Sequence, residues 1–346
     1  MELITASKDQ WDSFVEKSPQ ILQTWEWGEI KKSQGWDPIR IAVGENNSIS
    51  ASILLLKRKF PYINKCLFYA PRGPIFDNAG ALEYLLQKIK EEAKKHAAIA
   101  LKIDPEIEDS DSNRIDLFIK KGLKINKKQI QPRSTYFIDL TKDLETLLLS
   151  FEEKTRYNIR LSQKKGVIVE ELSGQIGVDI FYDLYKETAG RDNFLIHPKS
   201  YYQKILSLMG NNNMAKVFIA YLNKEPIAAV INFYFNKRIW YMYGASKSSH
   251  RNVMPNHAIH WEIIKRAKGY ELYDLWGIPS NPKLGHPLYG VWRFKKGFNG
   301  KLVKFVGCMD LVYEPIVYFI FENVFAWFKN IRSLILKGKI SDSLEE

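Results

Sequence analysis

A lysine pair framed by aromatic residues is the segment of this chain best suited by composition to take part in a reaction: Phe294-Lys295-Lys296-Gly297-Phe298. A lysine that aromatic side chains hold at the edge of a cleft can stabilise negative charge developing on a substrate. It can also bind an anionic group as a compact point charge. The motif therefore predicts a catalytic or substrate-binding position. The alternative is a basic turn on the protein surface.

Other common catalytic arrangements are not evident. The sequence shows no Ser/His/Asp or Cys/His motif, and its two cysteines, Cys66 and Cys308, exclude a disulfide framework and a cysteine-based zinc site. His257 and His260 can share one face of a helix, and His250 precedes them, but two well-placed histidines fall short of a usual zinc site. We expect no metal.

Two segments repeat one pattern of elements. Residues Arg238–Gly277 read as an aromatic strand, a polar loop with Arg251 and Asn256, a helix and a second strand. Residues Cys66–Asp104 read in the same way. Two copies of one α/β unit predict a duplicated fold with a cleft between the copies.

An aspartate stands at the end of the second strand in each copy, Asp104 in the first and Asp274 in the second. Either carboxylate could accept a proton from a reacting amine. The structural alternative is a hydrogen bond to the amide of a nearby loop. Arg251 and Asn256 have a structural alternative too, which is to order their loop and cap the helix that follows.

Length and charge set outer limits. The chain has 346 residues, enough for two domains, and a formal net charge of +12, which indicates a polyanionic partner or a lysine-rich proteome. The N-terminus lacks the pattern of a signal peptide, which predicts a cytoplasmic protein. No segment reaches the roughly 20 apolar residues of a membrane-spanning helix. The amphipathic stretch Tyr313–Leu336, with a basic end at Lys337 and Lys339, is expected either to dock on its own domain or to lie on a membrane surface.

The order of elements predicts an α/β fold of two tandem domains with mixed sheets flanked by helices. The first domain is expected at 1–133 with the C-terminal segment 304–346 packed on it, and the second at 134–303. The main predicted helices are Ser7–Glu16, Trp25–Gln34, Leu144–Lys165, Val178–Glu187 and Lys199–Met209, and the main predicted strands are Pro38–Gly44, Ser48–Arg58, Thr135–Leu140, Ala215–Leu222 and Ile227–Tyr234.

The strand, strand, helix, strand order is typical of the N-acetyltransferase (GNAT) fold. That fold binds pyrophosphate with backbone N–H groups of a glycine-bearing turn at a helix start. The corresponding segment here, Arg251–Asn256, has no glycine. Close approach of coenzyme A to the backbone is therefore not expected, and another acyl donor is favoured.

Several motifs in collinear order resemble the Fem family of peptidoglycan bridge-forming aminoacyltransferases (FemA, FemB, FemX). The motifs cover nearly the whole chain and are Gln23–Gly28 with Lys31, Tyr69–Pro74, Lys102–Pro105, Gln131–Leu140, Lys154–Val167, Glu187-Thr188, Arg191-Asp192, Tyr201-Tyr202, Tyr243–Asn256, Tyr273–Gly277 and Phe294–Phe298. The long helical arm of FemA-like members has no counterpart. The layout is that of the compact FemX type.

The resemblance implies transfer of an amino acid of the glycine, alanine or serine class from aminoacyl-tRNA to the stem peptide of a cell-wall precursor. The acceptor would be UDP-MurNAc-pentapeptide or lipid II, and lipid II implies peripheral contact with the inner face of the membrane. Aminoacyl esters are already activated, so aminoacyl-tRNA is the co-substrate and no cofactor is needed. The basic helix Lys154–Lys165 offers a stripe for the tRNA backbone or a solvated face.

The resemblance also assigns residues. It implies a catalytic role for Lys295 with Phe294 beside it, and precursor or tRNA contacts for Lys296. Lys31, one helical turn after Trp27, corresponds to a lysine at the precursor diphosphate. Further substrate contacts are expected from Arg191, Tyr201, Tyr243, Arg251, Asn256 and His197. His197 stands where the family commonly has arginine, and since histidine is largely neutral at pH 7, Arg191 is a candidate to compensate.

Two other interpretations remain open. The same fold could serve an acyl-CoA-dependent N-acyltransferase, against which the missing glycines argue. The chain could also be a non-catalytic module that binds tRNA or a membrane, against which the intact Lys295 motif argues.

Overall fold

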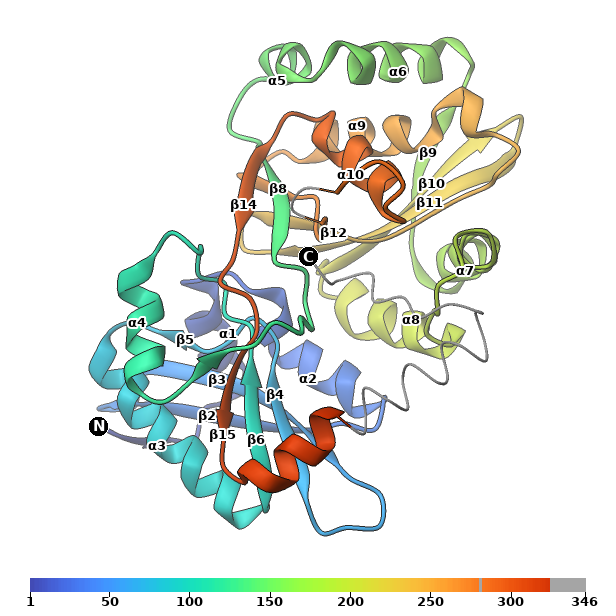
Figure 1. The fold of residues 1–346 in the computed structure, drawn as a ribbon. Coiled ribbons are helices and arrows are strands. Elements are labelled where there is room, and N and C mark those ends of the chain that lie inside the picture. Colours follow the sequence, from blue (N-terminus) through green and yellow to red (C-terminus); the bar gives the residue numbers. More distant parts are fainter. Residues whose placement is uncertain (280–281, 324–346) are drawn as a thin grey trace. The chain divides into compact units, whose positions relative to one another are not determined.

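The two segments that share one pattern in the sequence fold alike (Figure 1). In each, a strand leads into a helix, and the chain returns in a second strand that pairs with the first in parallel. The elements are β4 (Cys66–Ala70), α3 (Ala79–Lys95) and β6 (Ala98–Ile103) in the first copy, and β12 (Arg238–Ser246), α9 (Pro255–Arg266) and β13 (Leu272–Asp274) in the second. The duplication expected from the sequence is present.

The computed structural model describes residues 1–279 and 282–323. By its internal contacts the chain divides into two units. Unit 1 comprises Met1–Arg133 with the described residues from Lys304 onward, and unit 2 comprises Ser134–Val303. Each unit holds a mixed sheet flanked by helices, so the predicted α/β fold class is confirmed.

The eight-stranded sheet of unit 1 follows the path β1-β2-β3-β4-β6-β15-β7, with β5 paired to β3. Strand β15 comes from the chain that follows unit 2, and it pairs antiparallel with both β6 and β7. The sheet of unit 1 is therefore completed by a strand that follows unit 2 in the sequence. The remaining elements are β1 (Glu2–Ile4), α1 (Lys8–Glu16), a short turn η1 (Ile21–Gln23), α2 (Trp25–Lys32), β2 (Asp37–Glu45), β3 (Ser48–Lys59), β5 (Ile75–Phe76), α4 (Ser112–Lys120), β7 (Lys124–Ile125) and β15 (Met309–Val312).

The seven-stranded sheet of unit 2 has the order β14-β8-β13-β12-β11-β10-β9. Helix α9 buries its apolar face, including Ile259, Ile263 and Ile264, in the core of this unit. The remaining elements are β8 (Ser134–Asp139), α5 (Leu144–Ser150), α6 (Glu153–Lys164), β9 (Ile168–Leu172), α7 (Gly174–Asp192), α8 (Lys199–Ile205), a π-helical turn η2 (Leu206–Gly210), β10 (Ala215–Leu222), β11 (Glu225–Phe235), a short turn η3 (Arg251–Val253), α10 (Tyr289–Lys296) and β14 (Lys301–Lys304).

The prediction of one long helix over Leu144–Lys165 is wrong. Helix α5 ends at Ser150 and α6 begins at Glu153, because Phe151 is extended (φ −70°, ψ 155°) and turns its ring into the core. That ring meets the rings of Trp261 and Phe298, with centroid distances of 6.1 and 5.3 Å. The apolar positions on both sides of the break keep the helical period, so periodicity alone does not reveal it.

The other boundary corrections have local causes. The β10–β11 hairpin turns on Asn223 and Lys224, which both have positive φ (50° and 67°), so β11 begins at Glu225 and Pro226 lies in the strand. Asn256 does not cap α9. The cap residue is Met254 in the left-handed conformation (φ 55°), with no side-chain cap bond. The lysine motif is not a surface turn either, because Lys295 and Lys296 end helix α10.

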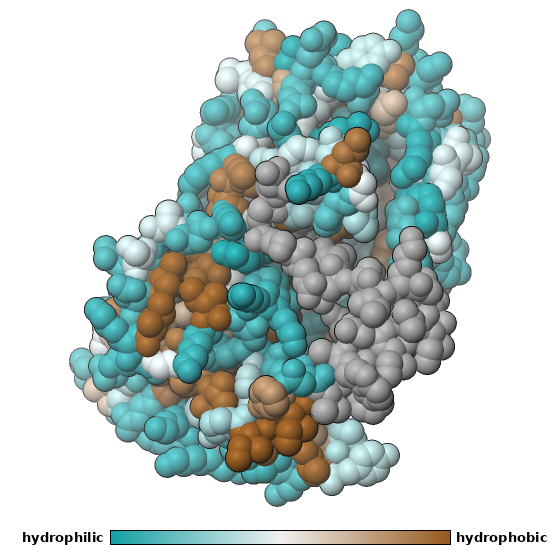
Figure 2. Space-filling model, viewed as in Figure 1, coloured by the Kyte–Doolittle hydropathy of each residue, from teal (hydrophilic) through white to brown (hydrophobic). Residues whose placement is uncertain are grey.

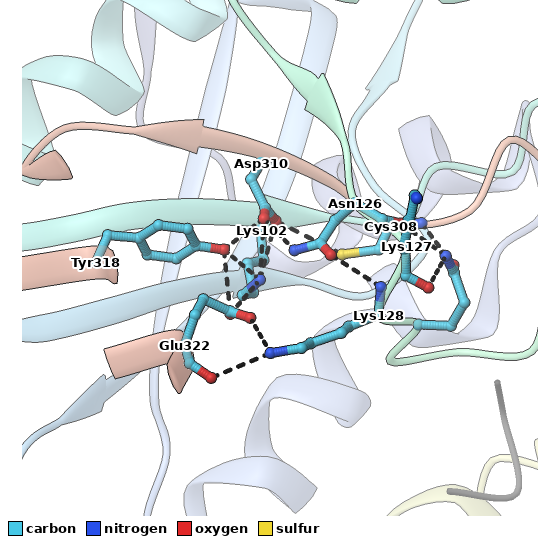
Figure 3. Close-up of polar contacts among 9 residues, drawn as sticks. Lys102, Asn126, Lys127, Lys128, Cys308, Asp310, Tyr318 and Glu322 are labelled. Carbon is cyan, nitrogen blue, oxygen red and sulfur yellow. Dashed lines mark hydrogen bonds and ion pairs between the residues drawn. The ribbon is translucent and has the colours of Figure 1, made fainter. Parts of the chain in front are cut away.

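A helix over residues 315–323 follows β15, so part of the stretch predicted to be amphipathic is helical, while Lys337 and Lys339 lie outside the described residues. A buried polar cluster fixes this helix to unit 1 (Figure 3). Lys102 of β6 bonds Asp310 of β15 at 3.1 Å and Glu322 of the helix at 2.9 Å. Among the described residues, no helix is both long and apolar enough to cross a bilayer.

Candidate active site

The parallel strands β12 and β13 of unit 2 separate after the paired residues Trp240 and Asp274. The register of β12 with β13 ends there, while β12 continues along β11 to Ser246. Lys295, on the last turn of α10, lies where the strands have separated. Its Nζ donates to the carbonyl oxygens of Trp276 (3.2 Å) and Gly277 (3.1 Å) and lies 5.0 Å from the centroid of the Tyr241 ring.

Burial gives Lys295 an unusual charge state. Only 5% of the residue is exposed, and this burial lowers the pKa of Lys295 to about 7, although the carboxylate of Asp274 acts in the opposite direction. An ammonium group has three N–H donors, and two of them bond to the carbonyls. Among the described residues, the third donor has no hydrogen-bond partner, on a group that gains and loses its proton near neutral pH.

The loop that supplies these carbonyls is anchored at Trp276 by Asp274. One carboxylate oxygen accepts the Trp276 amide at 2.8 Å and the Thr135 hydroxyl at 2.5 Å, and the other accepts the guanidinium of Arg238 at 2.8 Å. Trp276 has a positive φ of 57°, which the fixed amide helps to maintain. The aspartate thus acts on the site through the loop.

The equivalent aspartate of unit 1 has the same structural role. Asp104 accepts the Arg72 amide at 2.7 Å and the Tyr69 hydroxyl at 2.8 Å. Burial raises the pKa of Asp104 to about 6, against the effect of Arg72. The sequence allowed each aspartate either to accept a proton from an amine or to bond a loop amide. The bond to a loop amide is present in both copies.

The side chain of Phe294, the residue before Lys295, packs among aromatic and histidine rings of unit 2. Its ring lies 5.0 Å from His257, 5.3 Å from His260 and 5.3 Å from Phe298. His260 is fully buried and its Nδ1 lies 2.8 Å from the Tyr273 hydroxyl. Burial lowers the pKa of His257 to about 4 and that of His260 well below its ordinary value. Both rings are therefore neutral at pH 7.

A second group of predicted residues is brought together on α8 and β12. The hydroxyls of Tyr201 and Tyr243 lie 3.1 Å apart, and the His197 ring stacks on Tyr201 with a centroid distance of 4.1 Å. Burial raises the pKa values of both tyrosines well above their ordinary range, so both hydroxyls stay protonated. His197 is exposed, whereas Tyr201 is buried.

The remaining predicted residues lie apart from these two groups. Arg191 bonds the Ser246 carbonyl at 2.7 Å and so ties the end of α7 to the end of β12. Lys296 is exposed, with its Nζ 5.2 Å from the Trp292 ring. Arg251 is exposed and Asn256 half-buried at the start of α9.

Lys31 and Trp27 belong to unit 1, on helix α2. The Nζ of Lys31 lies 4.5 Å from the centroid of the Trp27 ring, so the two share one helix face. Burial lowers the pKa of Lys31 to about 8. The ring supports the cation and limits its freedom, which suits a site for an anionic group.

With this geometry in view, the chain can be compared with known proteins. The model of the FemAB family matches residues 6–116, 118–226 and 223–324. The chain belongs to the FemAB family. The resemblance inferred from its motifs is confirmed.

Two staphylococcal relatives match nearly the whole chain. The lipid II:glycine glycyltransferase of Staphylococcus epidermidis is 30% identical over 399 residues, covering 94% of this chain and 96% of the relative. The enzyme of the same name from Staphylococcus aureus is 31% identical over 404 residues with the same coverage.

Solved structures agree with the family assignment. A crystal structure of FemX matches with a TM-score of 0.87 and 27% identity, over 93% of this chain and 100% of that one. A tandem GNAT protein from the clavulanic acid biosynthesis pathway matches with a TM-score of 0.54 at 10% identity, over 90% of this chain and 98% of that one, which shows the shared fold. The tandem GNAT-like fold is confirmed. The longest helix in the described part of unit 2, α7, has 19 residues, which leaves no coiled-coil arm there.

Sequence reasoning missed the residues that surround the predicted ones. Tyr241 lies under Lys295, and Tyr202 and Tyr185 enclose Tyr243 with ring centroids 5.3 and 6.4 Å away. The signal was available in part. Tyr241 and Tyr243 belong to one aromatic strand, but a β-bulge between them turns the two rings to opposite faces of the sheet, Tyr241 toward His260 and Tyr243 toward Tyr202. The roles assigned to individual FemAB site residues stay predictions.

The buried lysine predicts how stability depends on pH. The folded chain protonates Lys295 below about 7, whereas the unfolded chain does so below the ordinary pKa of 10.5. Between these values the unfolded chain binds more protons, so the free energy of unfolding rises with pH, by at most about 1.4 kcal/mol per pH unit. Urea unfolding of the wild type and of Lys295→Met at pH of about 7 and about 9 measures this effect. The wild type should gain stability relative to the variant, and parallel behaviour would contradict a lowered pKa.

Proposed function

We propose that this protein transfers an aminoacyl group from aminoacyl-tRNA to the stem-peptide amine of a peptidoglycan precursor. The observation that carries the proposal is Lys295, buried where β12 and β13 separate, with two of its three donors bonded to backbone carbonyls and the third proposed to meet a substrate oxygen. The named staphylococcal relatives act on lipid II with glycine, and they match 94% of this chain. A lipid-linked acceptor and glycine are the first substrates to test.

The chemistry asked of the site is aminolysis of an ester. The acceptor amine attacks the acyl carbon, a C–N bond forms, the ester C–O bond breaks, and the amine proton passes to the leaving ribose oxygen. The ammonium of Lys295 stabilises the oxyanion of the tetrahedral intermediate. Because its pKa is about 7, the same group can deliver a proton to the ribose oxygen and recover one from the amine.

The precursor and the tRNA need cationic and aromatic contacts. Lys31 on the Trp27 ring offers a cation for a diphosphate. The Tyr201, Tyr243 and His197 group offers hydroxyls and a stacking face within unit 2. Peripheral contact with the cytoplasmic face of the membrane follows if the acceptor is lipid-linked.

Transfer from acyl-CoA is the competing function, and the start of α9 disfavours it. Pro255 at the first turn has no N–H, and the amides of His257 and Ala258 already donate to the Met254 carbonyl at 3.1 and 3.3 Å. Fewer backbone donors than at a glycine-bearing helix start are therefore available to hold a pyrophosphate.

The test is a transfer assay with purified protein. It is incubated with tRNA charged with glycine, alanine or serine and with lipid II or UDP-MurNAc-pentapeptide, and products are identified by mass. One added residue is expected with at least one pair. Free amino acid with uncharged tRNA should give no product. No mass increase with any pair would refute the proposal, and thiol release from acyl-CoA would support the competing function.

A further inference from the structure

One end of unit 1 exposes large apolar side chains from two distant parts of the chain. Figure 2 shows apolar surface there, where Figure 1 draws the helix over residues 315–323. The apolar patch consists of five residues with their exposed fractions: Tyr62 (104%), Ile63 (52%), Ile316 (77%), Phe319 (69%) and Ile320 (53%).

The opposite face of the same helix is firmly packed. Val317, Tyr318 and Phe321 pack on a small core of Leu67, Ile99 and Ala100, and Phe60 meets Phe321 with ring centroids 4.9 Å apart. Lys65 bonds Glu314 at 2.5 Å. Together with the polar cluster around Lys102 (Figure 3), these contacts fix the rotation of the helix, so the apolar patch is held outward.

The turn between β3 and β4 exposes an aromatic ring at a backbone angle that is unfavourable for a bulky side chain. Tyr62 has a φ of 67°, a conformation in which glycine or asparagine costs less than a bulky side chain. The ring is fully exposed, so packing within the described residues does not repay that cost. Aromatic residues are favoured at the boundary between water and lipid.

A lysine-rich groove meets the start of the helix over residues 315–323 at Lys65 and Glu314, while its wall α3 packs on the opposite face of the sheet. The groove has a volume of about 820 Å³ and lies between α3 and β15, with Lys65 and Glu314 at the end next to the patch. Its charged lining comprises Lys65, Lys90, Lys94, Lys121, Glu83 and Glu314, a surplus of cations. Lys59, exposed at the end of β3, is a further cation at this end of unit 1.

We propose that this end of unit 1 docks on an anionic lipid bilayer, with the apolar patch at the acyl-chain boundary and the groove lysines at the headgroups. The combination of projecting Ile, Phe and Tyr side chains with a cationic border fits a bilayer. The inference names the surface for the membrane contact and in that respect rests on the proposed function.

Sedimentation with vesicles tests the inference without tRNA or acceptor. The full-length protein should bind vesicles of mixed phosphatidylglycerol and phosphatidylcholine more tightly than vesicles of phosphatidylcholine alone. The variant Ile316→Asp/Phe319→Asp should bind the mixed vesicles at least ~10-fold more weakly. The control Ile176→Asp changes a residue of unit 2 that is 69% exposed, as Phe319 is, and should bind like the wild type. Lys90→Gln/Lys94→Gln should weaken binding to the mixed vesicles only.

Each other outcome overturns the inference. Equal binding by the wild type and the aspartate variant would remove the apolar patch from the contact. A dimer in solution that this variant disrupts would assign the patch to a second copy. If the variant had a lower melting temperature but unchanged vesicle binding, the apolar patch would instead pack against other residues of the same chain. Transfer to soluble UDP-MurNAc-pentapeptide should persist in the variant, so failure of docking and failure of the proposed function are distinguishable.

Discussion

Replacing Lys295 with methionine should lower the rate of aminoacyl transfer by about 10²- to 10³-fold, the usual effect of removing one donor to an oxyanion. Methionine has a similar length and is uncharged, so it fills the space against Tyr241 without a buried charge. The fold should therefore persist. The measurement is the single-turnover rate with saturating charged tRNA and acceptor, alongside circular dichroism of the same sample.

Lys296→Met is the matched control for this prediction. Lys296 is the next residue of α10 and is exposed, so its substitution removes the same charge without entering the site. It should weaken substrate binding at most and leave the single-turnover rate within about threefold. Similar rate losses in both variants would mean that the lysine pair acts only by attracting the polyanionic tRNA, and Lys295 would lose its catalytic role.

Much of the fold could be predicted because its signals are local. The hairpin of Ala215–Leu222 with its partner strand shows two apolar runs separated by a turn, and helix α1 shows an N-cap, Ser7, with a capping box. The duplication was visible because a parallel pair requires a crossover, which both copies fill with one helix. Strand β15 was not visible, since its pairing partners lie about two hundred residues earlier and four residues carry little pattern.

In the candidate site, too, local features could be predicted and contacts between distant segments could not. The motif around Lys295 could be recognised from residue types, but its burial and its pKa could not, because both arise from Trp276, Gly277 and Tyr241 on other elements. Conversely, Asn256 looked like a helix cap and is not one, since Pro255 and the left-handed Met254 set the helix start without it. Contacts between distant segments override local preference in both cases. The cleft between the copies stays a prediction.

The same dependence on distant contacts makes Asp274 important for stability. Asp274→Asn should lower the free energy of unfolding by about 3–5 kcal/mol, because it leaves the Arg238 guanidinium buried without its counter-charge. The side chains of Arg238 and Asp274 are only 9% and 2% exposed, and the guanidinium lies 4.8 Å from the Phe137 and Trp240 rings, which cannot replace a carboxylate. Urea unfolding measures the change.

An exposed ion pair near Asp274, Glu271 with Lys237, is the control for this prediction. Glu271, three residues before Asp274, bonds Lys237 at 2.6 Å, but both side chains are more than half exposed. Glu271→Gln should therefore cost no more than about 1 kcal/mol. Removing both charges of the buried pair, as in Arg238→Met/Asp274→Leu, should recover part of the loss of Asp274→Asn, because no unpaired charge then remains inside. If Asp274→Asn were as mild as Glu271→Gln, the buried pair would not hold the Trp276 loop, and the position of Lys295 would need another cause.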